Sequence, residues 1–249
     1  MRLWMRMKRL AATPLRRGPL ADYRRERAMN EGVAAAGAAA ELSFAEAVEG
    51  RGSVRQFLPD PVPREDVLRM VRLATRAASA GNKQMWRFVA IEDQSVKEQL
   101  AAAVDRKMDE MAAWPEVAEL QHLVKAIRGY NTFFVQSPLV FAVAALPYHA
   151  RVYELLDARD ASPAERERLR QRADLQSVGG AIQLLITAAH ALGYGACWMT
   201  APVVAAEEIE QILGIEPPAR FIAMVPVGRP ARPVRRSSRV PLEKVLRFV

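Results

Sequence analysis

Apolar residues recur at steps of three and four between Asp174 and Leu192, and the positions between them are mostly small. This period is that of an α-helix with one apolar face. Small neighbours such as Gly179 and Gly180 let a second backbone approach closely. The pattern therefore predicts a central helix that is buried on more than one side. Its apolar positions are Leu175, Val178, Ile182, Leu185, Ala189 and Leu192.

Short apolar runs elsewhere in the chain are typical of buried strands. Pro138 opens one of them, and Gly193 ends the central helix just before another. The last run ends at Gly228-Arg229-Pro230, after which the chain becomes rich in Pro and Arg. The expected strands are residues 86–91, 139–146, 194–200 and 221–227.

Capping signals mark the starts of the other helices. Ser43 is followed three residues later by Glu46, and Ser162 by Glu165, which is the spacing of a capping box. Pro63 is typical of a first helical turn and predicts a helix that runs to about residue 78. Helices and strands alternate without regular βαβ spacing, which favours an α+β fold. Further helices are expected over 95–132, 163–172 and 207–213.

The formal net charge of the 249-residue chain is +8. Residues 1–40 hold nine Arg or Lys against three acidic residues, so that only +2 remains for residues 41–249. A nucleic-acid-binding face needs a basic stripe on the folded domain, and none is visible. We expect no nucleic-acid partner, a basic, disordered extension over 1–40 and a folded domain over 41–249. A transit peptide, or a true start at Met29, is an alternative for the extension.

Membrane, metal and disulfide chemistry are not expected. The longest apolar run, near residues 139–146, is far shorter than the roughly 20 residues that a membrane-spanning helix needs. Cys197 is the only cysteine, which excludes an intrachain disulfide and is typical of a reducing compartment such as the cytoplasm. The three histidines are scattered without metal-site spacing. We expect a cytoplasmic protein with no membrane partner and no metal.

Residues 51–55, Arg-Gly-Ser-Val-Arg, form the most concentrated polar motif of the chain. Alternate side chains of an extended segment share one face, so Arg51, Ser53 and Arg55 should point together while Val54 points into the core. Guanidinium groups are planar, charge-assisted donors, and a serine hydroxyl adds a short neutral one. The motif indicates either an anion-binding row or a solvated basic turn.

Four separated segments together resemble the nitroreductase superfamily of FMN-dependent NAD(P)H oxidoreductases. They occur in the family's order and cover roughly residues 43–249. The resemblance implies an α+β three-layer sandwich with a mostly antiparallel central sheet flanked by helices, and an intertwined homodimer. It also implies FMN, with NADH or NADPH as electron donor and a nitroaromatic, quinone or enone as the small-molecule acceptor. The segments are Arg51–Arg55, Ala78–Phe88, Gln183–Trp198 and Val227–Pro230 with Arg239–Glu243.

The resemblance assigns roles to residues at two ends of the cofactor. Arg51 and Arg239 match arginines that hold the FMN phosphate, and Ser53 would bond the phosphate or the ribityl chain. Arg55 matches a basic residue beside flavin N1 and O2, where a cation stabilises the reduced ring. Gly52 and Val54 complete this cofactor-binding segment.

At the flavin ring, the resemblance implies contacts from a loop and from a strand end. Thr200 would hydrogen-bond flavin N5 and bias the ring between one- and two-electron chemistry. The chemistry itself would take place on FMN, and no catalytic side chain is expected. The residues expected at the ring are Ser79, Asn82, Gln84, Trp198, Met199 and Thr200.

Departures from the family pattern leave alternatives open. Met85 stands where many relatives have Pro, and Ser237 stands where a basic residue is expected, so that Arg235 or Arg236 would substitute for it. Thr200-Ala201-Pro202 looks more like the iodotyrosine deiodinase-like branch, although that branch's substrate-clamping Glu, Tyr and Lys are not visible over 104–132. A reductive dehalogenase is therefore one alternative function, and a non-catalytic basic binding protein is another.

Two candidate nucleophilic or basic side chains are interpreted as packed residues. Cys197 lies in an apolar strand with no base near it in sequence, and free cysteines are among the residues most often buried. His190 lies in an Ala/Leu-rich part of the central helix. No Ser-His-Asp order or G-x-S-x-G elbow indicates hydrolysis.

Overall fold

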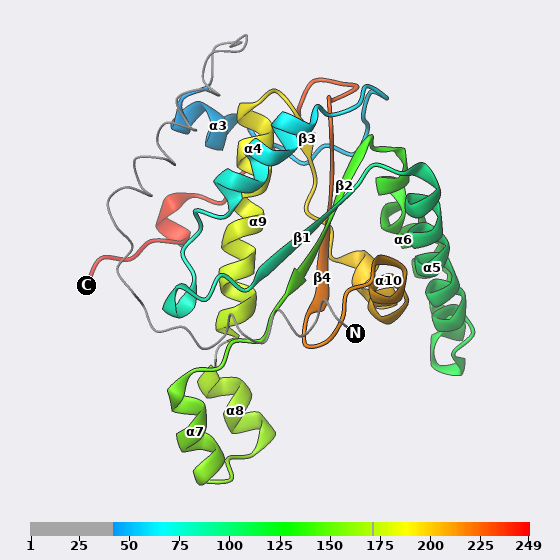
Figure 1. Ribbon diagram of the computed structural model, residues 1–249. Helices are drawn as coiled ribbons and strands as arrows, with labels where there is room; N and C mark the ends of the chain where they lie inside the picture. Colours follow the sequence, from blue (N-terminus) through cyan, green and yellow to red (C-terminus); the bar gives the residue numbers. More distant parts are fainter. Residues whose placement is uncertain (1–41, 171) are drawn as a thin grey trace, which may run out of the picture. The chain divides into compact units, whose positions relative to one another are not determined.

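The apolar runs of the sequence form a four-stranded sheet in the computed structural model, which describes residues 42–170 and 172–249 (Figure 1). The strand order is β1-β2-β4-β3, and every pair is antiparallel. The expectation for residues 1–40 lies outside the described residues. The strands are β1 (Trp86–Ile91), β2 (Leu139–Ala145), β3 (Gly195–Ala196) and β4 (Arg220–Gly228).

Helices and short 3₁₀ turns connect the strands. The α-helices are α3 (Phe44–Gly50), α4 (Arg64–Ala74), α5 (Gln94–Ala112), α6 (Gln121–Asn131), α7 (Arg151–Ala158), α8 (Pro163–Arg170), α9 (Ala173–Ala191) and α10 (Ala206–Leu213). The 3₁₀ turns are η1 (Ala80–Asn82), η2 (Pro115–Leu120), η3 (Phe133–Gln136), η4 (Ala201–Ala205) and η5 (Leu242–Lys244).

The strand β2 is buried along its whole length because both faces of the sheet are covered. Leu139, Phe141 and Val143 pack into a core with α4 and α9, whereas Val140 and Ala142 pack into a second core with α5 and α10. This division follows from the alternation of side chains along a strand. Figure 1 shows α4 and α9 on one side of the sheet and α5, α6 and α10 on the other. The expected three-layer α+β sandwich is confirmed.

The central helix is α9, as its sequence pattern predicts. Val178, Ile182 and Leu185 have no exposed surface and belong to the core beneath the sheet. Small residues admit its neighbours: a Cβ on Gly180 would lie 3.8 Å from Cβ of Ala77, which follows α4. The helix ends in a left-handed Gly193 with φ of 82°, which is the expected glycine stop.

The capping boxes are confirmed, but several element limits differ from those expected. Ser43 and Glu46 bond each other's backbone at the start of α3. The helix after Pro63 ends at Ala74, where the hydroxyl of Thr75 bonds back to the carbonyl of Arg72 at 2.8 Å. The helix expected over 95–132 is divided into α5, η2 and α6 because a proline disfavours helical geometry in the residue before it. The division falls at Trp114-Pro115, and α7 was not expected at all.

The third expected strand, 194–200, is reduced to Gly195–Ala196. Cys197 donates its N–H to the carbonyl of Pro226 at 3.3 Å, but a proline has no N–H to return. The ladder is interrupted at that point. It resumes as an isolated pair between Met199 and Met224, which exchange two hydrogen bonds of 2.8 and 2.9 Å.

No helix among the described residues is long and apolar enough to cross a membrane. The same part of the chain holds no cluster of three or more His, Cys, Asp or Glu arranged to bind a metal ion.

Tyr194 ties the end of α9 to α4. Its side chain is buried, and its hydroxyl donates to Oδ2 of Asp66 at 2.6 Å. The guanidinium of Arg229 lies 5.1 Å from the centre of the ring. Burial, followed by the hydrogen bond to Asp66, raises the pKa of Tyr194 to about 12.

We expect Tyr194→Phe to lower the free energy of unfolding by about 1.5–3 kcal/mol at neutral pH, because a hydrogen bond to a charged group is lost. The neutral phenol is the favoured form in the fold. The contribution is therefore complete below the unfolded-state pKa of about 10 and is lost as the pH rises through the folded-state pKa of about 12. Urea unfolding of both proteins should show their difference shrinking over this range. A constant difference would contradict the assignment.

Candidate functional site

The motif Arg51–Arg55 lies beside β3 as an extra extended segment. The N–H of Val54 donates to the carbonyl of Ala196 at 3.0 Å, and Ser53 forms a parallel bridge with Ala196. Val54 is buried, whereas Ser53 and Arg55 are exposed on the other side. A Cβ on Gly195 would lie 2.5 Å from Cγ2 of Val54, so a glycine is needed beneath it. The expected alternation is confirmed for these residues.

A stretch of the C-terminal tail, residues 229–237, runs along the other edge of this motif. The N–H of Leu58 donates to the carbonyl of Arg229 at 2.8 Å, and Phe57 pairs antiparallel with Pro230. Farther along the same alignment, a Cβ on Gly52 would lie only 2.4 Å from the carbonyl oxygen of Arg235. The tail thus keeps one antiparallel alignment, and its backbone touches Gly52.

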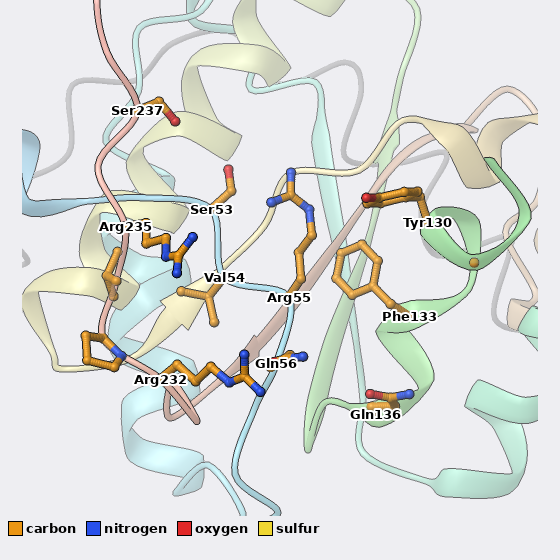
Figure 2. A pocket seen from close by; sticks show the side chains of 13 residues that line it. Ser53, Val54, Arg55, Gln56, Tyr130, Phe133, Gln136, Arg232, Arg235 and Ser237 are labelled. Atoms are coloured by element: carbon orange, nitrogen blue, oxygen red, sulfur yellow. The ribbon is translucent and has the colours of Figure 1, made fainter. Parts of the chain in front are cut away.

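A cavity of about 610 Å³ opens between the motif, the tail and α6 with η3 (Figure 2). Figure 2 shows Ser53, Arg235 and Ser237 toward the tail, while Tyr130 and Phe133 face Arg55 from the other wall. Tyr130 is 65% exposed and forms part of the rim. The lining residues are Ser53, Val54, Arg55, Gln56, Gly129, Tyr130, Phe133, Gln136, Arg232, Pro233, Val234, Arg235 and Ser237.

The cavity is strongly cationic. Arg55, Arg232 and Arg235 contribute three guanidinium groups, and no Asp or Glu lines the cavity. Within the described part of the chain, none of these three side chains has an ion pair or a hydrogen bond. Unpaired guanidinium groups beside serine hydroxyls suit an anion with several acceptor oxygens.

Two titratable groups, one buried and one partly buried, lie behind the motif. Burial raises the pKa of the Cys197 thiol, while Arg55, Ser53 and Arg51 oppose that shift. Burial lowers the pKa of His190, and the charges of Arg51 and Arg236 lower it further. Cys197 is 5% exposed and His190 is partly buried. Both shifts favour the neutral form of the side chain, as expected for packed residues.

Residues 48–229 match the sequence model of the nitroreductase family.

The chain belongs to the nitroreductase family.

Three relatives illustrate the range of the nitroreductase family around this chain. A crystal structure of a BluB-like flavoprotein from Clostridium difficile 630 has 29% sequence identity and a TM-score of 0.77, covering 84% of this chain and 99% of that one. An iodotyrosine deiodinase from Thermotoga neapolitana is 26% identical over 74% of this chain and 86% of its own. An NADH dehydrogenase from Thermus thermophilus is 27% identical over 79% and 91%, respectively.

Within this nitroreductase-family fold, the loop of Ser79, Asn82 and Gln84 does not line the cavity. The N–H of Ala80 donates to Oγ of Ser177 at 3.2 Å, near the start of α9. The motif at residues 51–55 begins nearer the other end of that helix, because a Cβ on the preceding Gly50 would lie 2.7 Å from Nε2 of His190 in the last turn of α9. Fourteen helical residues separate Ser177 from the end of α9, which corresponds to about 20 Å along its axis. The roles assigned to this loop stay predictions.

The strand end at Trp198, Met199 and Thr200 also lies outside the cavity lining. Met199 is buried against Met224, whereas Trp198 is 40% exposed. A Cβ on Gly179 would lie 3.3 Å from Cη2 of Trp198, so the indole packs against α9. Thr200 is exposed and precedes η4. The contact of Thr200 with flavin N5 stays a prediction.

The residues predicted to bind the phosphate and the N1/O2 edge of the flavin lie at different places, and their roles stay predictions. Ser53 and Arg55 line the cavity, whereas Arg51 does not. The guanidinium of Arg239 donates to the carbonyls of Ser237 and Ser238 at 3.1 and 3.2 Å, so it is turned toward its own backbone. Arg235, considered as a substitute for the missing basic residue at position 237, does line the cavity.

Sequence reasoning did not identify the remaining lining side chains. Arg232 belongs to a Pro/Arg-rich segment with several equivalent candidates, so its position depends on how the tail docks. Tyr130, Phe133 and Gln136 lie on α6 and η3, in a region interpreted only as helical. An available signal was the pair of aromatic residues just before the Pro138 strand start.

Proposed function

We propose that this protein is an FMN-dependent oxidoreductase that passes electrons from NADH or NADPH to a small organic acceptor of the nitroaromatic, quinone or enone type. The observation that supports the proposal most is the cavity between the Arg51–Arg55 motif and the tail. It combines three unpaired guanidinium groups, two serine hydroxyls and an aromatic wall, and it contains no carboxylate. Membership of the nitroreductase family and similarity to a flavoprotein support the same function.

The residues present fit FMN chemically. A phosphate dianion needs charged and neutral donors, which Arg235, Ser53 and Ser237 supply on the tail side of the cavity. Tyr130 supplies an apolar, flat surface on which a planar ring packs. A volume of about 610 Å³ lies within the usual range for small-molecule sites, which is roughly 300–1,000 Å³.

When bound, FMN supplies the redox chemistry by accepting an electron pair from the reduced nicotinamide and giving it to the acceptor. The chain's own residues bind and orient. Arg55 provides a fixed positive charge that favours the anionic form of a bound reduced group. The side chain of Tyr130 is largely exposed at the rim of the cavity.

We also propose that the protein acts as a homodimer. Ser79 and Asn82 are expected at the flavin, yet their loop is tied to the far end of α9 from the Arg51–Arg55 motif. In the proposed dimer, a second copy supplies this loop to the cavity of the first. Apolar side chains that a second copy would cover are exposed, including Phe44 at 80% and Phe248 at 87%.

The molar mass in solution tests the dimer proposal. Light scattering of the purified protein should give twice the chain mass of 27.7 kDa. A monomer that binds FMN with full affinity would contradict it, because the loop of Ser79 would then be unnecessary or wrongly placed.

A reductive dehalogenase is the second candidate function, because an iodotyrosine deiodinase is among the relatives. The described cavity offers no carboxylate to pair with the ammonium group of an amino acid. If this chain removes halogens, its cationic lining fits a halogenated phenolate better than iodotyrosine. A cytoplasmic location remains part of the proposal and is supported by the single, buried Cys197.

The function is tested by turnover after FMN loading. NADH and NADPH oxidation should depend on added acceptor, and a panel of nitroaromatic, quinone, enone and halophenol compounds would identify its class. Turnover of the halophenols and of no other acceptor class, with release of halide, would favour the dehalogenase. A protein that takes up no FMN but binds DNA with a steep salt dependence would contradict both and favour a basic binding protein.

A further inference from the structure

Lys97 of α5 is buried, which is unusual for lysine. Lys97 is 3% exposed, and its Nζ donates to the main-chain carbonyl of Ser137 at 2.7 Å. Burial lowers the pKa of Lys97, although the nearby carboxylates of Asp93, Glu92 and Glu98 oppose the shift. Burying an ammonium group costs free energy unless it is paired, and the hydrogen bond to Ser137 offsets part of that cost.

The carbonyl that Lys97 holds belongs to the junction between η3 and β2. Ser137 is 1% exposed, and its N–H donates to the carbonyl of Phe134 at 3.0 Å. Its hydroxyl lies within hydrogen-bond distance of two carbonyls, those of Phe134 at 2.7 Å and Leu139 at 3.0 Å. Every polar group of Ser137 is therefore engaged, and the lysine supplies the partner of its carbonyl.

The turn η3 connects this buried junction to the candidate flavin cavity. Phe134 has no exposed surface and anchors the turn in the core shared with α5. Phe133 and Gln136, on the same turn, line the cavity opposite the Arg51–Arg55 motif (Figure 2). Gln136 also lines a second cavity of about 390 Å³ together with Lys97 and Ser137. Gln136 therefore borders both cavities, and its position depends on where η3 is held.

We infer that Lys97 is a positioning residue, which acts through the Ser137 carbonyl to hold η3 so that Phe133 and Gln136 form the wall that selects the electron acceptor. The inference rests on the proposed function. Lys97 itself touches neither cofactor nor acceptor. Its substitution should therefore act on acceptor recognition while leaving the anion-binding residues of the opposite wall in place.

Lys97→Met tests this inference because it keeps the length and apolar stem of the side chain and removes the charged donor. Lys97→Arg keeps a donor and serves as the rescue. Two controls lie on the same helix. Lys107→Met removes an exposed lysine that pairs with Glu110, and Leu100→Ala removes a fully buried side chain and so destabilises the core.

We expect Lys97→Met to raise KM for the acceptor roughly tenfold, which is near the lower end for the loss of one charge-assisted hydrogen bond, because η3 no longer holds Phe133 and Gln136 in place; kcat and the Kd for FMN should not change. Hydrogen exchange of the amides of residues 133–137 should become faster than in the Leu100→Ala protein. Lys97→Arg should restore KM toward the wild-type value, and Lys107→Met should change neither quantity.

Equal effects of Lys97→Met and Leu100→Ala on KM and on exchange would overturn the inference, since they would show a general loss of stability. Unchanged exchange at residues 133–137 would also overturn it. A wild-type protein that reduces no acceptor would refute the proposed function instead. The exchange rates, which need no turnover, would then still decide whether Lys97 holds the turn.

Discussion

Replacing Arg235 with alanine is expected to weaken FMN binding by about 10- to 100-fold. Arg235 lines the cavity from the tail and has no ion pair within the described part of the chain. A charge-assisted hydrogen bond contributes about 1.5–3 kcal/mol, which corresponds to this loss in affinity. Quenching of flavin fluorescence on titration with the protein measures the Kd directly.

Arg239→Ala is the matched control for Arg235→Ala, because both arginines lie in the same exposed tail. The family resemblance assigns the phosphate to Arg239, whereas the structure turns its guanidinium onto the carbonyls of Ser237 and Ser238. We expect the smaller effect from Arg239→Ala. A larger loss with Arg239→Ala than with Arg235→Ala would show that the tail rearranges around the cofactor and that the described lining is incomplete.

The second large effect is expected from Gly52→Ala, the smallest possible enlargement in the motif. The new Cβ would lie 2.4 Å from the carbonyl oxygen of Arg235, and a backbone atom cannot rotate away as a side chain can. Either the motif or the tail must move. We expect a loss of about 1–3 kcal/mol in unfolding free energy and a loss of FMN affinity of at least tenfold, measured by urea unfolding and flavin titration.

Gly129→Ala provides the control for Gly52→Ala, since Gly129 lines the same cavity from α6 and a Cβ there meets nothing within 4 Å. Alanine is a better helix former than glycine by about 1 kcal/mol. We therefore expect this variant to be at least as stable as the wild type and to bind FMN normally. If Gly52→Ala behaves in the same way, the tail is not docked against the motif.

Much of the fold could be predicted from the sequence because its signals are local and mutually consistent. The uninterrupted apolar run at Leu139 predicts a strand covered on both faces, and the small residues of α9 predict a helix with close neighbours. The limits of β3 were not predictable in this way. They depend on Pro226 lying opposite Cys197 in another strand, a pairing that neither segment reveals by itself.

The candidate site could be predicted only in part for the same reason. The alternation of Ser53, Val54 and Arg55 follows from extended geometry and was correctly interpreted. The other two walls depend on tertiary contacts. Arg235 rather than Arg239 reaches the cavity because the tail aligns antiparallel to residues 52–58, and Phe133 faces it because Lys97 and Ser137 hold η3.

The most direct test of the central claim compares FMN with riboflavin, which carries the same ring and ribityl chain without the phosphate. The account predicts that the wild-type protein binds FMN at least about tenfold more tightly than riboflavin. This ratio corresponds to roughly the free-energy contribution of one charge-assisted hydrogen bond. It further predicts that Arg235→Ala removes most of this preference while leaving riboflavin binding nearly unchanged. Equal affinity of the wild-type protein for the two flavins, or no affinity for either, would contradict an anion-anchored flavin site between the Arg51–Arg55 motif and the tail.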